Sequence, residues 1–476
     1  MRIPIACLLL ASTFAQPQDS TLDSTPDPTP GHELLRPNFL VVVTDDQRFD
    51  QLGCAGHAVL RTPVMDSLAK RGVRFTNAFV TTPICAASRA SLMTSRWEGS
   101  HGYTFGTPPM GPELAEDTYF ERLQKAGYRT TYAGKWGVRF TPGERAKMFD
   151  DIKVMAAPYI RKNGDRTHLT DRTANAAIAQ MPADGSKGPF CMTVSFNAPH
   201  AEDPHPDQYI PPPDLAGMYE DAEVPVPPYA TEGFSVLPPF IQESMGRRRW
   251  GWRFDTREKQ VRRTKDYWSM ISGVDRALGR ILSALEERGF ADNTIVILMG
   301  DNGYFLGERG LAGKWLIYEE SIRVPLIVYD PRSRPAVSEG PAAAAVEPGT
   351  TLSPMVLNVD VAPTLVDLAG LPVPESYEGR SLVPLLQGET PQWRTDFLME
   401  HRFDNKEIPK SVGLRGPRWV YALYDEQEPP YEQLFDLETD PAQLKNLAGD
   451  ETYQAALEAA RARCSALRLA PSGREK

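Results

Sequence analysis

The chain has 476 residues, of which 41% are hydrophobic and 24% are charged, a composition that excludes both a disordered protein and a multispanning membrane protein. Acidic residues outnumber basic ones, 62 against 52, so neither a nucleic acid nor an anionic membrane surface is an expected partner. Five cysteines without a Cys-x-x-Cys pair and seven histidines without a His-x-His or His-Glu-x-x-His cluster indicate neither a disulfide scaffold nor a zinc site.

The chain begins with the features of a secretory signal peptide. Arg2 is followed by a short apolar run and then by small residues up to Ala15. A buried first strand is the alternative interpretation. We predict a signal peptide over residues 1–15, a disordered leader rich in Ser, Thr and Pro over residues 16–36, and export to the periplasm or the cell exterior. No other stretch holds about eighteen consecutive apolar residues, so no membrane span is expected.

From Asn38 onward, the hydrophobic pattern is that of an α/β protein. Continuous β-branched runs predict strands buried on both faces, and amphipathic patterns predict helices at Pro63–Arg71 and from about Asp266 to Arg288. Because strands alternate with helices, we expect a large, mostly parallel sheet flanked by helices. The predicted strands are Phe39–Val43, Phe190–Phe196, Thr294–Met299 and Val324–Tyr329.

This α/β domain is predicted to cover residues 37–390. Two proline-rich stretches within it, residues 199–239 and 331–354, are interpreted as long surface insertions. Shorter elements then predict a smaller C-terminal α+β subdomain over residues 391–476. They include a strand at Trp419–Tyr424 and a final helix at Tyr453–Leu467.

Polar side chains follow the predicted strands at the point where each strand ends. Asp45 and Asp46 follow the first strand, His200 follows the second, and Asp301 and Asn302 follow the third. Ligands of open α/β sheets bind at the carboxyl ends of the strands, so these side chains are expected to converge. Their hard oxygen atoms suit Ca²⁺ or Mg²⁺ better than zinc. The alternative is that they only make turns and helix caps.

Cys85 is expected at the N-terminus of a helix, because an apolar stretch gives way there to a helical pattern. Arg89 lies four residues further on and shares its face. The helix dipole and the guanidinium both favour negative charge at position 85, which describes an anion site with a reactive side chain. A buried, inert cysteine is the alternative.

The segment from Cys85 to Arg96 resembles the hallmark of the type I formylglycine-dependent sulfatases, an arylsulfatase-like family of the alkaline phosphatase superfamily. That hallmark reads C-x-P-S-R-x-x-x-(L/M)-T-G-R. The resemblance covers most of the chain through an ordered set of further motifs, which is specific as a set. These are Pro37-Asn38, Thr44-Asp-Asp-Gln47, Thr62-Pro-x-x-Asp66, Gly134-Lys-Trp136, Gly300-Asp-Asn-Gly303, Gly313-Lys-Trp315, Leu434–Pro441 and Asn446-Leu-Ala448.

The resemblance implies an enzyme that hydrolyses a sulfate ester, on a sulfated small molecule, sugar or polysaccharide. A formylglycine-generating maturation enzyme then oxidises Cys85, and the hydrated aldehyde supplies the hydroxyl that attacks sulfur. Ca²⁺, or Mg²⁺ in its place, is implied as the bound metal, where it lowers the pKa of that hydroxyl. The implied ligands are Asp45, Asp46, Asp301 and Asn302, with position 85 completing the sphere.

The same resemblance assigns roles to four further side chains. Lys135 and Lys314 match the family's sulfate-binding lysines, which stabilise charge on the sulfate oxygens. His200 matches the histidine that, together with Lys314, protonates the leaving alkoxide. Arg89 is implied to hold position 85 in place. Taken without the motifs, such lysines are usually solvated, and His200 is a loop histidine before a proline-rich stretch.

The chain departs from the family pattern at two positions. Ala87 stands where the hallmark has proline, which affects recognition by the maturation enzyme. Gly137 stands where the family reads Gly-Lys-Trp-His, and that histidine is the expected base for expelling sulfate. Either another group takes this role, with His101 and His168 as candidates, or turnover is slow.

Two segments are candidates for substrate contact. Residues 247–253 interleave arginines with tryptophans and could stack a sugar ring and attract a polyanion, or form only a solvated loop. The segment Glu400-His401-Arg402 could approach the mouth of the site. The candidate substrate-binding residues are His101, Trp250, Arg253 and His401.

Two other functions stay open at this point. Sulfate and phosphate are both tetrahedral oxyanions, so a phosphonate or phosphate ester hydrolase of the same superfamily is the nearest rival. The departures at Ala87 and Gly137 motivate a second rival, a catalytically inactive protein that binds sulfated glycans. A cysteine hydrolase would need a histidine base beside Cys85, and no local motif provides one.

Overall fold

The computed structural model describes the chain except for residues 2–35, 162–163, 184–187, 334–345 and 470–476. The predicted signal peptide and nearly all of the predicted leader therefore lie outside the described residues. The elements below belong to the compact unit that begins at Arg36. Within the described part of the chain, no helix combines the length and the apolar character needed to cross a membrane.

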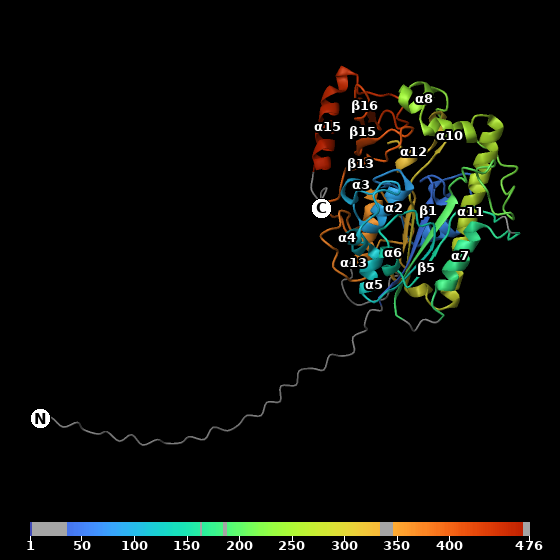
Figure 1. The fold of residues 1–476 in the computed structure, drawn as a ribbon, viewed down its shortest axis with the longest axis vertical. Helices are drawn as coiled ribbons and strands as arrows, with labels where there is room; N and C mark the ends of the chain where they lie inside the picture. Colours follow the sequence, from blue (N-terminus) through green and yellow to red (C-terminus); the bar gives the residue numbers. More distant parts are fainter. Residues whose placement is uncertain (2–35, 162–163, 184–187, 334–345, 470–476) are drawn as a thin grey trace. The chain divides into compact units, whose positions relative to one another are not determined.

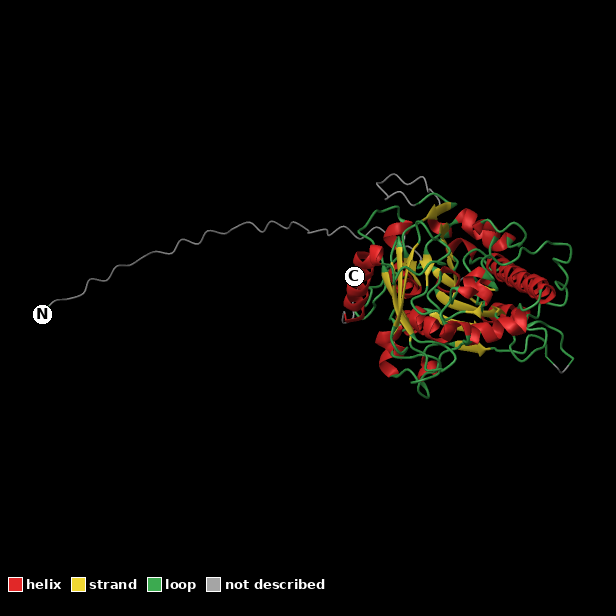
Figure 2. Ribbon diagram, turned by 90° about the horizontal axis from the view of Figure 1, so that it is seen from above, coloured by secondary structure: helices red, strands yellow, loops and turns green. Residues whose placement is uncertain are grey.

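A mixed eight-stranded sheet forms the centre of this unit (Figures 1 and 2). Its strands are β1 (Asn38–Asp45), β2 (Val73–Phe75), β4 (Arg129–Gly134), β5 (Asp151–Val154), β6 (Phe190–Pro199), β7 (Thr294–Gly300), β10 (Leu326–Tyr329) and β11 (Thr350–Leu352). They lie in the order β11-β2-β10-β7-β1-β6-β4-β5. All pairs are parallel except those of β10 with β7 and with β2. The predicted fold class is confirmed, and the strand predicted at 324–329 begins two residues later and runs antiparallel.

Side chains of β1 alternate between two hydrophobic cores, one on each face of the sheet. Leu40 and Val42 pack with α1, α7 and α11, whereas Phe39, Val41 and Val43 pack with α2, α5 and α13. This is why the run reads as continuously apolar in the sequence. These helices are α1 (Pro63–Arg71), α2 (Cys85–Thr94), α5 (Tyr119–Lys125), α7 (Leu169–Gln180), α11 (Arg257–Glu287) and α13 (Val361–Leu368).

The long helix α11 begins nine residues before the predicted start at Asp266. Its first turn is capped by the Thr256 hydroxyl, which accepts a hydrogen bond from the Lys259 N–H at 3.2 Å. Shorter elements complete the α/β part of the chain. They are α3 (Glu98–His101), α4 (Pro112–Glu116), α6 (Glu144–Lys147), α8 (Glu232–Ser235), α9 (Pro239–Gln242), α10 (Met245–Arg253), α12 (Glu319–Ile322), α14 (Val383–Leu386), and the strand pairs β3 (Ala78–Phe79) with β12 (Val356–Leu357) and β8 (Phe305–Leu306) with β9 (Ala312–Gly313).

The proline-rich stretch at 199–239 is only in part the surface insertion that its sequence indicates. Tyr209 and Tyr219 from this stretch are buried against α11. The Tyr219 hydroxyl lies 2.6 Å from that of Ser272, which it meets in a hydrogen bond. The stretch therefore covers the apolar face of α11 next to the sheet. The second stretch, 331–354, includes β11 at the sheet edge as well as residues outside the described ones.

An antiparallel sheet of four strands forms the C-terminal part of the unit, with helix α15 (Gln454–Leu469) against it (Figure 1). Its strands are β13 (Phe397–His401), β14 (Ser411–Arg415), β15 (Trp419–Tyr424) and β16 (Tyr431–Asp436). The predicted strand at 419–424 is confirmed, and the predicted final helix begins one residue later and ends two residues later. Trp97 is buried between the two parts and donates a hydrogen bond to the Leu398 carbonyl at 2.9 Å. The domain boundary at 390/391 stays a prediction.

Helix α1 is capped by a side chain from α11. The buried carboxylate of Asp275 accepts hydrogen bonds from the backbone N–H groups of Val64, at 3.1 Å, and Met65, at 2.8 Å. We expect Asp275→Ala to lower the free energy of unfolding by about 2–3 kcal/mol, because two buried donors lose their acceptor. Asp275→Asn keeps one acceptor oxygen and should cost less than half as much. Denaturant unfolding followed by tryptophan fluorescence measures both, and equal losses would contradict the capping role.

Candidate active site

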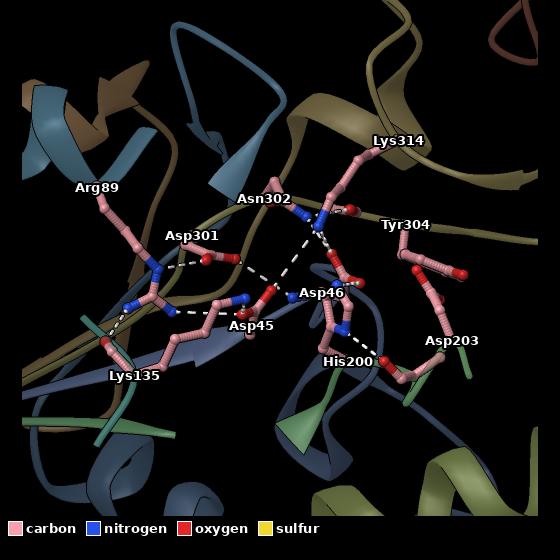
Figure 3. A network of polar contacts seen from close by, with 12 residues as sticks. Asp45, Asp46, Arg89, Lys135, His200, Asp203, Asp301, Asn302, Tyr304 and Lys314 are labelled. Carbon is pink, nitrogen blue, oxygen red and sulfur yellow. Dashed lines mark hydrogen bonds and ion pairs between the residues drawn. The ribbon is translucent and has the colours of Figure 1, made fainter. Parts of the chain in front are cut away.

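Polar residues from four neighbouring strands converge at one edge of the central sheet (Figure 3). Asp45 ends β1, and Asp46 follows it with a left-handed φ of 65°. The backbone N–H of Asp46 donates to Asp301, which follows β7, at 3.3 Å. Lys135 follows β4 and His200 follows β6. These strand ends lie close together in the structure, as their sequence predicts.

The two adjacent aspartates contact different cations. Asp45 contacts the Lys135 ammonium through Oδ2, and its Oδ1 lies 3.8 Å from the Lys314 ammonium. Asp46 contacts the Lys314 ammonium through Oδ1, the same atom that accepts a hydrogen bond from the Asn302 amide at 2.6 Å. Its Oδ2 lies 3.7 Å from Nε2 of His200. The pair therefore connects both lysines, as the dashed contacts in Figure 3 show.

Helix α2 begins at Cys85, as its sequence predicts, and carries Arg89 one turn later. The Arg89 guanidinium donates to Asp301 Oδ2 at 2.8 Å and to the Lys135 carbonyl at 2.9 Å. It also donates to the Ser195 hydroxyl, a contact that has no spacing signature in the sequence. Arg89 therefore ties the helix that bears Cys85 to the ends of β7 and β4 and to the interior of β6.

Three carboxylates lie buried beside Arg89, Lys314 and the partly buried Lys135 and His200, and the pKa values of the site follow from this arrangement. Burial alone would raise the pKa of Asp45, but the positive charges of Lys135, His200, Lys314 and Arg89 hold that pKa below its usual range. The pKa of Asp301 is raised, first by burial and then by the nearby charge of Asp45.

The surroundings also shift the pKa values of Cys85, His200 and Lys314. Burial raises the pKa of the Cys85 thiol, against the attraction of Lys135 and Lys314. Burial lowers the pKa of His200 to about 4, against the attraction of Asp46. Burial works against the charged form of Lys314, but the surrounding carboxylates raise its pKa well above the usual value, so its ammonium keeps its proton. An unmodified Cys85 is therefore a poor thiolate nucleophile.

The donor set fits a hard divalent cation. Among the described residues, the buried atoms Oδ1 of Asp45 and Oδ1 of Asn302 have no hydrogen-bond partner. Ligand atoms of Asp45, Cys85 and Asp301 lie within 4.8 Å of one another, as do those of Asp45, Asp46 and His200. Carboxylate and amide oxygens gathered in this way are suited to Ca²⁺ or Mg²⁺.

The two histidines considered as substitutes at position 137 have both ring nitrogens engaged. His101 accepts a hydrogen bond from the Tyr103 N–H at 3.0 Å through Nδ1, and its Nε2 lies 3.0 Å from the Ser91 hydroxyl. His168 caps α7 through Nδ1, and its Nε2 lies 2.8 Å from the Ile210 carbonyl. Both are buried, so the structure gives them packing and capping roles.

The basic and aromatic segment 247–253 forms most of helix α10 rather than a loop. Arg253 is fully buried and bonds to Gln208 at 2.9 Å, and it also contacts Asp203 and the Tyr304 hydroxyl. Trp250 is half-buried under the Arg247 guanidinium, 3.8 Å from its ring centre. Arg253 therefore positions Asp203, which lies beside His200 in Figure 3 and which the sequence analysis missed.

Comparisons with known proteins assign the chain to a family. The sulfatase family model matches residues 37–371, and the model of the N-sulphoglucosamine sulphohydrolase C-terminal region matches residues 307–469. The chain belongs to the sulfatase family. It is a sulfuric ester hydrolase, as its resemblance to formylglycine-dependent sulfatases implies.

Individual relatives of this sulfatase act on different esters. This chain is 26% identical to an N-acetylglucosamine-6-O-sulfatase of Bacteroides thetaiotaomicron, over 95% of this chain and 87% of the relative. A solved structure of a protein in complex with its substrate D-glucosamine-2-N,6-O-disulfate has a TM-score of 0.77 and 24% identity, over 90% of this chain and 97% of the other. The phosphonate monoester hydrolase from Silicibacter pomeroyi has a TM-score of 0.75 and 21% identity, over 91% and 95%. These structural likenesses show the fold.

Gly137 adopts a backbone conformation that a histidine tolerates poorly. Its φ is 73°, and a Cβ placed there would lie 3.2 Å from Cδ of Arg89 and 4.0 Å from Cε of Lys135. We expect Gly137→His to lower the free energy of unfolding by about 1–2 kcal/mol, through backbone strain, and to lower kcat about ten-fold or more, through displacement of the two cations.

A matched control separates strain from crowding. Gly217 has a φ of 79° and no atom within 4 Å of an added Cβ, so Gly217→His should cost stability without changing kcat. Both variants are measured with matured protein on an aryl sulfate and by thermal unfolding. A rise in kcat on introducing histidine at 137 would contradict the expectation.

Proposed function

We propose that this sulfatase removes sulfate from a sugar or polysaccharide, using formylglycine formed from Cys85 and a bound Ca²⁺. The observation that carries the proposal is the position of Cys85 at the start of α2, within reach of the carboxylates of Asp45 and Asp301. The ammonium groups of Lys135 and Lys314 favour negative charge at position 85. The carboxylates can bind a metal cation, and the lysines can bind the oxygen atoms of an anionic ester, so both can be held next to the nucleophile at position 85.

Asp45, Asp46, Asp301 and Asn302, with the oxygen at position 85, would hold the metal. When bound, the cation supplies Lewis-acid chemistry that polarises sulfate oxygens, and formylglycine supplies a hydroxyl nucleophile. The proposal also includes export to the periplasm or the cell exterior and oxidation of Cys85 by a formylglycine-generating enzyme.

The surrounding side chains bind, orient and move a proton. Lys135 and Lys314 bind sulfate oxygens, and Arg89 holds α2 against Asp301 so that position 85 stays in place. His200 and Lys314 lie on the Asp46 side and deliver the proton to the leaving alkoxide. The raised pKa of Lys314 keeps its ammonium protonated, so it is the member of this pair that carries a proton before the reaction.

A sugar ester is the substrate class that the comparisons favour. The N-acetylglucosamine-6-O-sulfatase acts on a sulfated amino sugar, and the C-terminal region of this chain matches the N-sulphoglucosamine sulphohydrolase model. The phosphonate monoester hydrolase fold keeps phosphonate and phosphate esters as the competing class.

Formylglycine at position 85 is tested by mass spectrometry of the tryptic peptide that covers residues 75–89, from protein made in its own host. We expect a peptide lighter by the exchange of thiol for aldehyde, whereas the peptide containing Cys191, a buried cysteine in β6, stays unmodified. The Cys85→Ala variant should lose at least about a thousand-fold in turnover with its unfolding unchanged, because it lacks the nucleophile.

The same matured protein is assayed on an aryl sulfate and on the matching aryl phosphate and phosphonate. Preferential release of sulfate supports the proposal. A large preference for phosphonate or phosphate would replace it by the rival hydrolase. Glycan binding without any release after verified maturation would replace it by the inactive binding protein.

Metal dependence is tested by chelation and by Asp301→Asn, which keeps a partner for Arg89 while removing a ligand charge. We expect chelation to lower turnover about a hundred-fold or more, with Ca²⁺ restoring it. Bound calcium, measured by elemental mass spectrometry, should be lost in Asp301→Asn but retained in Asp214→Ala, an exposed carboxylate paired with Arg276. Full calcium content in Asp301→Asn would contradict the ligand assignment.

A further inference from the structure

A polar cavity of about 230 Å³ lies beside the C-terminal sheet. Of the candidate site residues, His401 alone is part of its lining. It opens at the end of β13 and the start of β14, the two strands that flank the loop 402–410. A cavity lined almost entirely by charged and hydroxyl groups suits a hydroxylated, charged ligand rather than an apolar one. Its lining includes His401 and Ser411, three basic residues (Arg402, Lys410 and Arg468) and three acidic ones (Glu400, Asp425 and Glu426).

Two buried polar groups in this lining have no hydrogen-bond partner among the described residues. His401 and Ser411 face each other across β13 and β14 and are 1% and 4% exposed. The unpartnered atoms are Nε2 of His401 and the hydroxyl oxygen of Ser411. An unpaired buried polar atom costs about 1–3 kcal/mol, so a ligand that pairs with these atoms would recover that free energy.

The chemical character of the histidine is fixed by its surroundings. Its Nδ1 accepts a hydrogen bond from the Phe403 N–H at 3.4 Å, so the proton of the neutral ring lies on Nε2. Burial lowers the pKa of His401 to about 3, which keeps the ring neutral. Nε2 is therefore a donor suited to a hydroxyl or sulfate oxygen, and the adjacent Ser411 hydroxyl can donate or accept.

The loop 402–410 connects this cavity with the surroundings of Cys85. Phe403 and Ile408 from the loop pack with Ile84, Ala87 and Trp315. These three residues lie within two positions of Cys85 or Lys314 in the sequence. At the near end of the loop, the Glu400 N–H donates to the Thr81 carbonyl at 2.9 Å, and four residues of extended chain span at most about 14 Å from Thr81 to Cys85.

An exposed aromatic side chain packs against the loop 402–410. Phe105 is 48% exposed, and its ring centre lies 5.1 Å from that of Phe403. Tyr103, two residues earlier, donates a hydrogen bond to the Gly137 carbonyl at 3.2 Å, which places this segment beside the turn that carries Lys135. An exposed phenyl ring in this position can stack on the apolar face of a sugar.

We propose that the cavity lined by His401 and Ser411 is a second subsite for the glycan, and that it holds a polar sugar unit beyond the one desulfated at position 85. The inference rests on the proposed function and extends it. The preferred substrate is then a sulfated oligosaccharide chain that passes Phe105 and Phe403. Lys410 contacts Glu426 at 2.8 Å and Arg468 lies 3.5 Å from Asp425, so the lining offers both charges, together with the Ser411 hydroxyl, to the polar groups of that unit.

Binding to Cys85→Ala, which cannot turn over, tests the subsite by calorimetry. The probes are D-glucosamine-2-N,6-O-disulfate and a size-defined heparin tetrasaccharide. We expect the tetrasaccharide to bind about ten-fold more tightly than the monosaccharide, because it occupies both places. Adding Lys410→Gln or the conservative Ser411→Ala should reduce that advantage about five-fold, with the monosaccharide Kd unchanged.

The matched control is Lys406→Gln, which makes the same charge change at an exposed position of the same loop outside the cavity lining. It should leave the advantage of the tetrasaccharide intact. Equal Kd values for the two probes, or equal effects of Lys406→Gln and Lys410→Gln, would overturn the proposal. Sulfate release from the monosaccharide by matured protein is scored separately, so loss of the subsite and loss of the proposed function are distinguishable.

Discussion

The hydrogen bonds of the Arg89 guanidinium are the interaction on which the site depends. One side chain joins Asp301 after β7, the carbonyl of Lys135 after β4 and the hydroxyl of Ser195 within β6. Helix α2 is thereby fixed against three strands of the sheet, and Cys85 at its first position is fixed with it. Removing one partner from a buried, hydrogen-bonded charge pair costs several kcal/mol, so this arrangement tolerates little change. The close positioning that chemistry on an oxyanion requires follows from the same rigidity.

Charge balance explains how an acidic protein can hold an anion site. Asp45, Asp46 and Asp301 are buried beside Arg89, Lys314 and the partly buried Lys135, so the formal charges of this cluster cancel. A bound divalent cation would make this pocket positive while the whole chain keeps its net charge of −10. An anionic ester is then attracted to the site although the chain as a whole is acidic.

The convergence of the strand ends could be predicted because a parallel sheet brings the carboxyl ends of its strands to one edge. Once the strands were recognised in the sequence, Asp45, Asp301 and His200 could be placed together at that edge. The helix start at Cys85 was likewise visible in the local pattern. By contrast, Ser195 and Asp203 act through contacts with Arg89 and Arg253 from distant elements, and no spacing encodes such contacts. The antiparallel direction of β10 and the burial of Tyr209 and Tyr219 depend on tertiary packing and were missed for the same reason.

The glycine at position 137 belongs to the same mechanical argument. The turn after β4 is held at two carbonyls, that of Lys135 by Arg89 and that of Gly137 by the Tyr103 hydroxyl, and the same hydroxyl accepts a hydrogen bond from the Arg139 N–H at 3.1 Å. These contacts fix the left-handed conformation of Gly137 and bring its Cα next to Arg89. A side chain there would compete with the guanidinium for space. The turn therefore serves to position Lys135. In the proposed mechanism, position 137 supplies no base for expelling sulfate, and His200, which lies beside Asp46, is a histidine at hand for that role.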